Sequence, residues 1–485
     1  VIKNSLIVYF ARWQQGFLNL FDVYLSDKLF SYYINQPFER YLKHNSSKYV
    51  RNLTYEMSNF KGALQHYMNL VTEGIILIFF SSFLIYINPI ATLVIFFILF
   101  IFSSFYFFGP LNKLLKKWSK ERLHFSDKYT KHLIQGLESV KEIRIYQSED
   151  EARTNHYNAK KKVNDLLRHL VVLSVIPKNL FEIITILILS SCIFYYSING
   201  DNLIEIIPLI GVYLVAAYKI LPSMVKILNS INSLKFFHAS IDHIFNELKE
   251  QKKNYLEKIN KDKIDTFKNL IFKNVDFKYS SSSQKIFSNF SLKLKKGDIV
   301  GIKGESGSGK STLINLMLGL LKPTSGRILL NGKNLQMNKN GWLKIVSYVP
   351  QNIYITDDNI YKNVGFGKKI YEINKQRVIA LLKKLKIYKD IKSKGFTKNV
   401  GQRGSFFSGG QAQRVVLARA LYKDPDVIFF DEATSSLDKK NERNIIKLIL
   451  QLKRKKTLVI SSHNDELLNL CDRVLNLKKG LIVTK

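Results

Sequence analysis

Residues 304–312 read Gly304-Glu305-Ser306-Gly307-Ser308-Gly309-Lys310-Ser311-Thr312. This pattern fits G-x-x-x-x-G-K-[ST], the P-loop, in which backbone N–H groups cradle phosphates. An apolar stretch at 298–302 precedes it, which predicts a strand entering the loop and a helix beginning near Lys310, with its positive end toward the anion. Lys310 would contact the β- and γ-phosphates, and the Ser311 hydroxyl would bind Mg²⁺. A chance turn rich in Gly and Ser is the alternative, and the order of strand, loop and helix argues against it.

A second apolar run, residues 427–430, ends in the carboxylates Asp431 and Glu432. Such a run predicts a buried strand whose carboxyl end lies beside the P-loop. Asp431 would hold Mg²⁺, directly or through water, and Glu432 would polarise the water that attacks the nucleotide. Capping of the following helix by the two carboxylates is the alternative, and it is compatible with both roles.

A second anion site is indicated by Ser408-Gly409-Gly410-Gln411, which precedes a predicted helix at 412–421. Its backbone amides would lie at a helix N-terminus, where anions bind. One nucleotide cannot use this loop and the P-loop of the same chain. We therefore expect two chains to pair head to tail, with ATP between the P-loop of one and the Ser408 loop of the other, so that pairing depends on ATP.

Five apolar stretches are candidates to cross a membrane as helices. They are residues 5–25, 71–88, 90–108, 171–197 and 203–222. Asn88-Pro89 and the polar run 199–202 separate neighbouring stretches, as tight turns between two spans do. Buried helices of a soluble protein are the alternative, but the agreement of lengths and turns favours membrane spans.

Positive charge predicts how these spans are oriented. Residues 26–70 carry six Lys and Arg side chains and residues 109–170 carry fourteen, whereas the two short turns carry none. By the positive-inside rule both long segments are cytoplasmic, and their apolar spacing predicts helices. Five spans would then place the first residues outside, so we expect a preceding, sixth span that this chain lacks.

The chain divides by composition into three parts. We predict a transmembrane domain at 1–248, a charged linker at 249–268 and a soluble domain at 269–485. In the last, short apolar strands alternate with helical patterns. The predicted fold class is an α-helical transmembrane bundle followed by an α/β P-loop NTPase domain. The protein would lie in the cytoplasmic membrane, with the soluble domain in the cytoplasm.

The net charge of +36 is the most unusual feature of the composition. Such a charge is typical of proteins that bind nucleic acid or an anionic membrane surface. A general bias toward Lys, Ile, Asn, Tyr and Phe is the alternative. The two cysteines, Cys192 and Cys471, provide neither a disulfide framework nor the spacing of metal ligands.

Taken together, the P-loop, the Ser408 loop and the acidic pair after 427–430 resemble the ATP-binding cassette (ABC) transporter family. The resemblance covers nearly the whole chain, because spans fused ahead of a cassette are similar to exporter-type half-transporters. It implies ATP and Mg²⁺ as cofactors, ATP hydrolysis coupled to transport, and pairing with a second half-transporter. A homodimer is permitted and a heterodimer is left open.

The resemblance also implies roles for four further residues. Gln351 resembles the Q-loop glutamine, which senses Mg²⁺ and faces the membrane helices. His463 resembles the switch histidine at the γ-phosphate, and Tyr279 resembles the aromatic residue that stacks on adenine. Asp438 lies in Ser436-Leu437-Asp438, which resembles the D-loop.

Two positions depart from the family pattern. Phe407 stands where the cassette usually has Leu, a conservative apolar change. Gln402 stands where exporters carry an acid that helps to couple the cassette to the cytoplasmic helices, so the coupling is in question. We expect residues around 45–55 and 138–146 to transmit closure of the ATP-bound pair to the spans.

The substrate prediction depends on residues 218–226 and their continuation to Leu248, which resemble flippases of lipid-linked oligosaccharides. Lys219 and Lys226 are seven residues apart, so both lie on one face of a helix. Arg12 lies within the first apolar stretch, where a charge is costly and tends to face a cavity. The three cations would attract a pyrophosphate headgroup. In the alternative reading, they extend to the lipid headgroup regions.

We therefore expect ATP-driven export or flipping of a lipid-linked oligosaccharide, or another anionic amphiphile, from the inner to the outer leaflet. An exporter of a peptide, a toxin or another lipid is the second candidate. A soluble DNA-associated cassette ATPase is the third, suggested by charge alone. The predicted spans argue against it, and we expect no nucleic acid partner.

Overall fold

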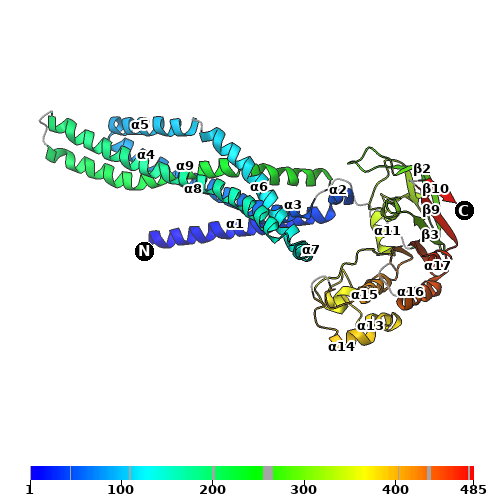
Figure 1. Cartoon of the computed structure of the whole chain (residues 1–485). Coiled ribbons are helices and arrows are strands. Elements are labelled where there is room, and N and C mark those ends of the chain that lie inside the picture. Colours follow the sequence, from blue (N-terminus) through cyan, green and yellow to red (C-terminus); the bar gives the residue numbers. More distant parts are fainter. Residues whose placement is uncertain are drawn as a thin grey trace. The chain divides into compact units, whose positions relative to one another are not determined.

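The computed structural model describes residues 2–43, 45–108, 111–198, 203–254, 266–401, 404–433, 439–478 and 481–484. It divides into two compact units. The first comprises Val1–Gln36 and His44–Leu256, and the second comprises Pro37–Lys43 and Glu257–Lys485. The first unit is helical and the second contains the sheets (Figure 1). The predicted fold class, a helical transmembrane bundle followed by an α/β domain, is confirmed.

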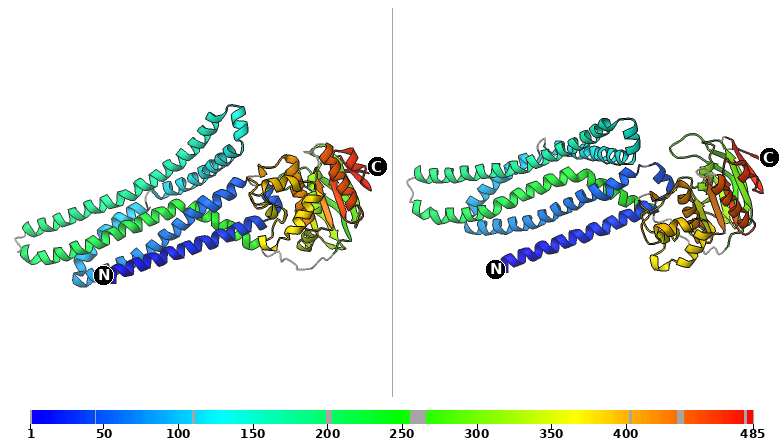
Figure 2. Two further views of the ribbon diagram at one scale, coloured as in Figure 1. Left: turned by 90° about the horizontal axis from the view of Figure 1, so that it is seen from below. Right: turned by 60° about the horizontal axis from the view of Figure 1, so that its bottom comes forward.

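Long helices of the first unit run side by side (Figure 2). Its elements are α1 (Ile2–Asn35), α3 (Ser46–Arg51), the π-helix η1 (Asn52–Glu56), α4 (Met57–Ile87), α5 (Pro89–Phe108), α6 (Leu111–Glu138), α7 (Val140–Ile145), α8 (Glu149–Ile198) and α9 (Leu203–Asn254). Between α4 and α5, Asn88 is extended, with φ −150° and ψ 100°. A residue before proline is disfavoured in the helical region, and proline is accepted at a helix start, so Asn88-Pro89 breaks the helix as expected.

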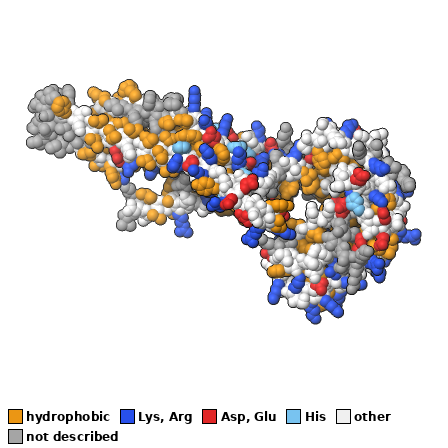
Figure 3. Space-filling model, viewed as in Figure 1, with side chains coloured by type: hydrophobic (Ala, Val, Ile, Leu, Met, Phe, Trp, Pro, Cys, Tyr) orange, Lys and Arg blue, Asp and Glu red, His pale blue; other side chains and the backbone are white. Residues whose placement is uncertain are grey.

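Among the described residues, three helices are long and apolar enough to cross a membrane: Ser46–Ile87, Glu149–Ile188 and Gly211–Glu250. On the face drawn in Figure 3, hydrophobic side chains gather along the first unit. The predicted spans 71–88, 171–197 and 203–222 overlap these helices. The predicted spans 5–25 and 90–108 lie in α1 and α5, and that these cross the membrane stays a prediction. The predicted turn 199–202 lies outside the described residues.

The stretch predicted as a linker begins as helix. Helix α9 continues to Asn254, because Lys, Glu and Gln are good helix formers even where no apolar side chain packs. The following strand β1 begins at Asn269, the position predicted for the soluble domain. The rest of the predicted linker, 255–265, lies outside the described residues.

A buried polar network joins three elements of the first unit. Ser240 Oγ of α9 donates to Glu56 Oε2 of η1 at 2.5 Å, and Arg122 Nη2 of α6 lies 3.5 Å from the same oxygen. Glu56 is 0% exposed and Arg122 is 3% exposed. Arg122 also donates to Ser240. A buried carboxylate needs such a partner, because an uncompensated charge in the interior is costly.

The second unit contains two sheets. A four-stranded antiparallel sheet has the order β2-β1-β4-β5, and a six-stranded sheet has the order β10-β9-β3-β8-β7-β6. In the larger sheet the pairs from β9 to β6 are parallel and β10 is antiparallel. The strands are β1 (Asn269–Phe277), β2 (Phe287–Lys295), β3 (Ile299–Gly304), β4 (Ser325–Leu330), β5 (Lys333–Asn334), β6 (Val346–Val349), β7 (Val427–Asp431), β8 (Thr457–Ser461), β9 (Arg473–Lys478) and β10 (Leu481–Thr484).

Helices complete this unit. They are α2 (Phe38–Lys43), α10 (Lys310–Met317), α11 (Lys339–Ile345), α12 (Ile360–Val364), η2 (Ile370–Glu372), α13 (Lys375–Lys384), α14 (Tyr388–Lys394), α15 (Gly409–Tyr422), α16 (Lys439–Leu452) and α17 (Asp465–Leu468). Strands β7 and β8 are buried at every residue, as expected for apolar parallel strands covered on both faces. The carboxyl ends of β3, β7 and β8 therefore meet at one edge of the sheet, where ligands of such folds bind.

Candidate nucleotide-binding site

The P-loop connects β3 to α10, as the sequence predicts. Gly309 precedes α10 with φ 100°, a conformation that glycine adopts without steric cost. At Gly304 an added Cβ would lie 2.5 Å from Ser308 Oγ and 2.8 Å from the Leu477 carbonyl oxygen, so no larger residue fits. Lys310 Nζ donates to the Gly304 carbonyl at 2.7 Å. The lysine side chain therefore folds back over the loop.

The side chains of Lys310, Glu432 and His463 converge at the mouth of this loop. Lys310 Nζ donates to His463 Nε2 at 2.9 Å and lies 3.5 Å from Glu432 Oε1. His463 Nε2 lies 3.4 Å from the same carboxylate oxygen. The residues come from α10, from the end of β7 and from the segment after β8. The structure thus brings together three predicted site residues that are far apart in the sequence.

Glu432 is held from several sides. Its backbone N–H donates to the Ser461 carbonyl at 3.0 Å, and its φ of 48° is unusual for a residue other than glycine. Such backbone conformations persist where neighbouring contacts enforce them, often at functional sites. Gln351 Nε2 donates to Glu432 Oε2 at 2.6 Å. The predicted Q-loop glutamine is therefore in direct contact with the predicted catalytic carboxylate.

Asp431 lies on the other side of the same strand end. Its carboxylate accepts a hydrogen bond from Tyr348 Oη at 3.2 Å and is also hydrogen-bonded to Ser311. Burial raises the pKa of Asp431, although these two hydrogen bonds oppose the effect and the neighbouring Glu432 adds to it.

The residues present fit Mg-ATP. Ser308 Oγ is buried and has no hydrogen-bond partner among the described residues, which suits a loop that awaits an anion. Ser311, Asp431 and Gln351 offer the oxygen ligands that Mg²⁺ prefers. Within the described residues, no group of three or more His, Cys, Asp or Glu could hold a metal ion. Mg²⁺ commonly takes its other ligands from phosphate and water.

The raised pKa of Asp431 predicts an effect of this residue on stability. We expect Asp431→Asn to raise the unfolding midpoint of the nucleotide-free protein at pH 8 by on the order of 2 °C. Because the folded-state pKa is raised, the ionised form destabilises the fold, and this penalty grows as pH rises through the folded pKa. It is absent below the ordinary pKa of about 4. Scanning fluorimetry across this range checks the result, and a variant less stable than wild type at pH 8 would contradict it.

Tyr279 lies beside the P-loop. Its hydroxyl is 3.1 Å from Thr312 Oγ1, and its ring meets that of Phe277 edge-on, with centroids 5.0 Å apart. The predicted adenine-stacking residue is thus next to the predicted triphosphate site. Tyr348 was not identified from the sequence. The only sequence feature that points to a role for Tyr348 in the site is its position on β6, the strand that precedes Gln351.

The Ser408 loop caps α15. Ser408 Oγ accepts from the Gln411 N–H at 3.3 Å, and the Ser408 N–H donates to Gln411 Oε1 at 3.1 Å. Lys394 Nζ of α14 lies 3.5 Å from Gln411 Oε1. Among the described residues, no hydrogen bond or ion pair links this loop to the P-loop, so its use by a second chain stays a prediction. Predicted residues Gln402 and Asp438 lie outside the described residues.

The three predicted substrate cations have different surroundings. Lys226 Nζ pairs with Glu73 Oε1 at 2.6 Å, so its charge is largely offset. Lys219 Nζ lies 5.2 Å from the centre of the Tyr218 ring, and Arg12 is exposed on α1. Glu73 was missed in the sequence interpretation, although an acidic residue within an apolar span is itself a signal.

Comparison with known proteins identifies both units. The family model of the ABC transporter transmembrane region matches residues 19–215, and that of the ABC transporter matches residues 287–435. The chain belongs to the ABC transporters. With both regions in one chain, this ABC transporter has the half-transporter arrangement. A solved structure of a bacterial Atm1-family ABC exporter with ATP bound has the same fold, with a TM-score of 0.77, 20% identity, and coverage of 99% of this chain and 83% of that one.

Relatives differ in what they export. YgaD of Bacillus subtilis (strain 168), provisionally named a multidrug export ATP-binding/permease protein, is 26% identical over 98% of this chain and 81% of its own length. The ATP-dependent lipid A-core flippase of Ralstonia nicotianae is 36% identical over 44% of this chain and 37% of its own. The alpha-hemolysin translocation protein HlyB of Escherichia coli is 33% identical over 44% and 31%. The chain thus spans about a third of the last two.

Proposed function

We propose that this ABC transporter is an exporter-type half-transporter that hydrolyses ATP to move an amphiphilic substrate across the cytoplasmic membrane. The observation that carries the proposal is the cluster of Lys310, Glu432 and His463 at the P-loop, in one chain with helices long and apolar enough to cross a membrane. The cassette would lie in the cytoplasm.

ATP would bind with its phosphates in the P-loop and its base against Tyr279. Lys310 is placed to hold the terminal phosphates. Glu432 is placed to accept a proton from the attacking water, and His463 to contact the γ-phosphate. Mg²⁺, when bound at Ser311, Asp431 and Gln351, would neutralise phosphate charge. Gln351 also contacts Glu432, so binding of the metal at Gln351 would affect the position of Glu432, the proposed general base.

The active unit would be a pair of half-transporters, with a second copy of this chain as the simplest partner. The Ser408 loop supports this arrangement, because it lies at the N-terminus of α15, where an anion would bind, and no described hydrogen bond or ion pair links it to the P-loop of the same chain. Apolar side chains at and next to α7 also support it, since Val140, Ile145 and Tyr146 are 40%, 64% and 79% exposed. Such apolar exposure marks surfaces that bind a partner.

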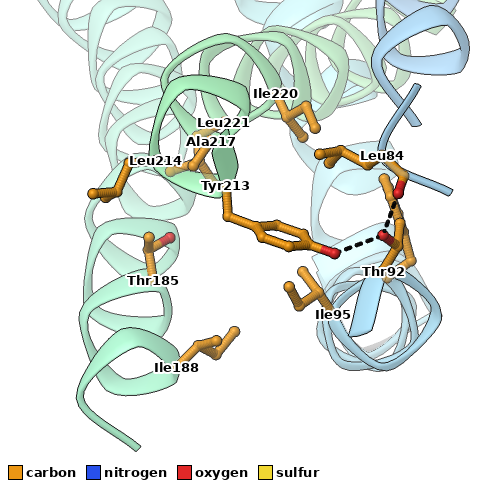
Figure 4. Close-up of a pocket in the computed structure, with 11 residues that line it drawn as sticks. Leu84, Thr92, Ile95, Thr185, Ile188, Tyr213, Leu214, Ala217, Ile220 and Leu221 are labelled. Carbon is orange, nitrogen blue, oxygen red and sulfur yellow. Dashed lines mark hydrogen bonds between the residues drawn. The ribbon is translucent and has the colours of Figure 1, made fainter. Parts of the chain in front are cut away.

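The substrate would be a lipid-linked oligosaccharide or another anionic amphiphile. A cavity of about 70 Å³ lies among α4, α5, α8 and α9 (Figure 4). Its lining is apolar apart from three hydroxyl groups and consists of Leu84, Thr92, Ile95, Phe96, Thr185, Ile188, Tyr213, Leu214, Ala217, Ile220 and Leu221. Two of those hydroxyls, of Thr92 and Tyr213, are 2.9 Å apart and satisfy each other. The cavity therefore suits hydrocarbon, and Arg12 and Lys219 would attract the anionic end.

The match to a lipid A-core flippase favours a lipid substrate. The match to HlyB, of similar extent, favours a peptide or toxin exporter as the second candidate. In both cases the similarity covers 44% of this chain, so neither match decides the cargo.

ATPase activity in liposomes would separate these candidates. Polyprenyl-pyrophosphate oligosaccharide and ordinary anionic phospholipid would be titrated in parallel. We expect the oligosaccharide lipid to raise ATP turnover severalfold at concentrations where the phospholipid has no effect. Equal responses, or none, would leave an exporter of another cargo and would favour peptides. A Lys310→Ala variant, which we expect to lack turnover, measures contaminating ATPase.

A further inference from the structure

Helix α2 belongs to the cassette unit, although its residues lie between α1 and α3 in the chain. Glu39 Oε1 accepts a hydrogen bond from the Ser280 N–H at 2.9 Å and another from the Ser280 hydroxyl. These bonds, with Lys43 nearby, lower the pKa of Glu39. The carboxylate is therefore ionised at neutral pH, and hydrogen bonds to an ionised acceptor are stronger than neutral ones.

Ser280 is the direct neighbour of Tyr279 and begins a run of four serines that ends at Ser283. Residues 280–285 are exposed. An exposed serine-rich segment has no apolar anchor of its own, so ordering it costs conformational entropy. Glu39 supplies a fixed attachment at the residue next to Tyr279.

The loop that carries Tyr279 also lies close to both α2 and the P-loop. Phe38 of α2, Tyr279 and Ile286 are partly buried against one hydrophobic core. A Cβ added to Gly309 of the P-loop would lie 2.9 Å from Ile286 Cγ2. The loop of residues 279–286 is therefore held between α2 on one side and the P-loop on the other.

We propose that Glu39 is a positioning residue for the nucleotide base, which acts by holding the loop that carries Tyr279 in place for stacking. This inference rests on the proposed function in one respect, the contact of Tyr279 with adenine. Glu39 does not touch the nucleotide. Helix α2 lies between α1 and α3 in the chain but within the cassette unit, so a segment far from the P-loop in sequence would set the affinity of the cassette for the nucleotide base.

The test measures binding of two ligands by the full-length protein in detergent micelles. Mg-ATP has a base, whereas inorganic tripolyphosphate occupies the P-loop without one. We expect Glu39→Ala to raise the Kd for Mg-ATP on the order of tenfold, because two hydrogen bonds to a charged group are lost. The Kd for tripolyphosphate should change less than about twofold. KM for ATP should rise in parallel, with kcat at saturating ATP preserved.

Three further variants separate positioning from folding. Glu39→Gln keeps one acceptor oxygen, and Ser280→Ala keeps the backbone donor. Both variants should therefore raise the Kd for Mg-ATP by less than Glu39→Ala does and leave the Kd for tripolyphosphate unchanged. Glu372→Ala removes a carboxylate that also accepts from a backbone N–H, that of Lys369 at 3.0 Å, and should leave both Kd values unchanged. Equal losses for both ligands in the Glu39 variants, or unchanged ATP binding, would overturn the proposal. Failure of wild type to bind Mg-ATP would instead overturn the proposed function.

Discussion

Glu432→Gln is expected to lower ATP turnover by about 10²- to 10⁴-fold, the usual contribution of a general base. The amide cannot accept the proton of the attacking water, whereas it retains the shape of the carboxylate. Gln351, Lys310 and His463 surround Glu432, and replacing a negative charge there should not weaken the binding of an anion. We therefore expect the variant to retain ATP and to remain as an ATP-bound pair.

Single-turnover and steady-state ATPase assays, together with size analysis in the presence of Mg-ATP, check this result. Glu466→Gln is the matched control, because Glu466 is an exposed carboxylate in the same unit, on α17. It should keep wild-type turnover. Ordinary turnover in Glu432→Gln would remove Glu432 from the role of general base.

The second large effect concerns stability. We expect Arg122→Met to destabilise the helical unit by about 3–5 kcal/mol, the usual cost of breaking a buried ion pair from one side. Glu56 is fully buried, and without Arg122 its charge has only the Ser240 hydroxyl as a described hydrogen-bond partner. Unfolding midpoints of the purified protein in detergent, with its yield from membranes, measure the loss.

The double variant Arg122→Met with Glu56→Gln tests the cause. Removing both charges leaves no uncompensated ion, so the double variant should recover most of the loss. A control at the exposed pair of Arg153 and Asp150, 3.5 Å apart, should shift stability by less than about 1 kcal/mol when Arg153 is replaced. A double variant as unstable as Arg122→Met alone would contradict the charge-based explanation.

Local sequence patterns predicted the strands, loop and helix that carry the candidate nucleotide-site residues. The P-loop fixes its own geometry, because glycine positions and the following helix are neighbours in the chain. The run at 427–430 could be assigned to a buried strand from hydrophobicity alone, and parallel topology then placed Asp431 and Glu432 beside Lys310. The roles of these residues stay predictions, which the Glu432 and Asp431 variants test.

Features that depend on packing between distant segments could not be predicted. That residues around 45–55 and 138–146 transmit closure stays a prediction. Helices α3 and η1 of the first stretch lie in the helical unit, where Arg51 Nη1 donates to Asp127 Oδ1 at 2.8 Å. Pro37–Lys43, which contains α2, belongs to the cassette unit although it lies between α1 and α3 in the chain, and the sequence patterns did not predict this. A helix of six residues has too few turns to show its period in the sequence.

The same limit applies to the substrate cations. The sequence gives no sign that Lys226 is paired, because its partner, Glu73, lies 153 residues away on another helix. A positive residue in an apolar span is expected to have an acidic partner, but the sequence does not show which residue that partner is. The proposed anion site is accordingly weaker at Lys226 than at Arg12 and Lys219.

Movement of the lipid between leaflets can be followed in sealed proteoliposomes. The reconstituted protein would receive Mg-ATP on the cassette side, and the exposure of a fluorescent polyprenyl-pyrophosphate oligosaccharide to a membrane-impermeant quencher would be followed. We expect the labelled lipid to leave the cassette-facing leaflet with Mg-ATP in wild type and to stay there in Glu432→Gln. Wild-type protein that hydrolyses ATP while the lipid distribution matches that of Glu432→Gln would contradict this expectation.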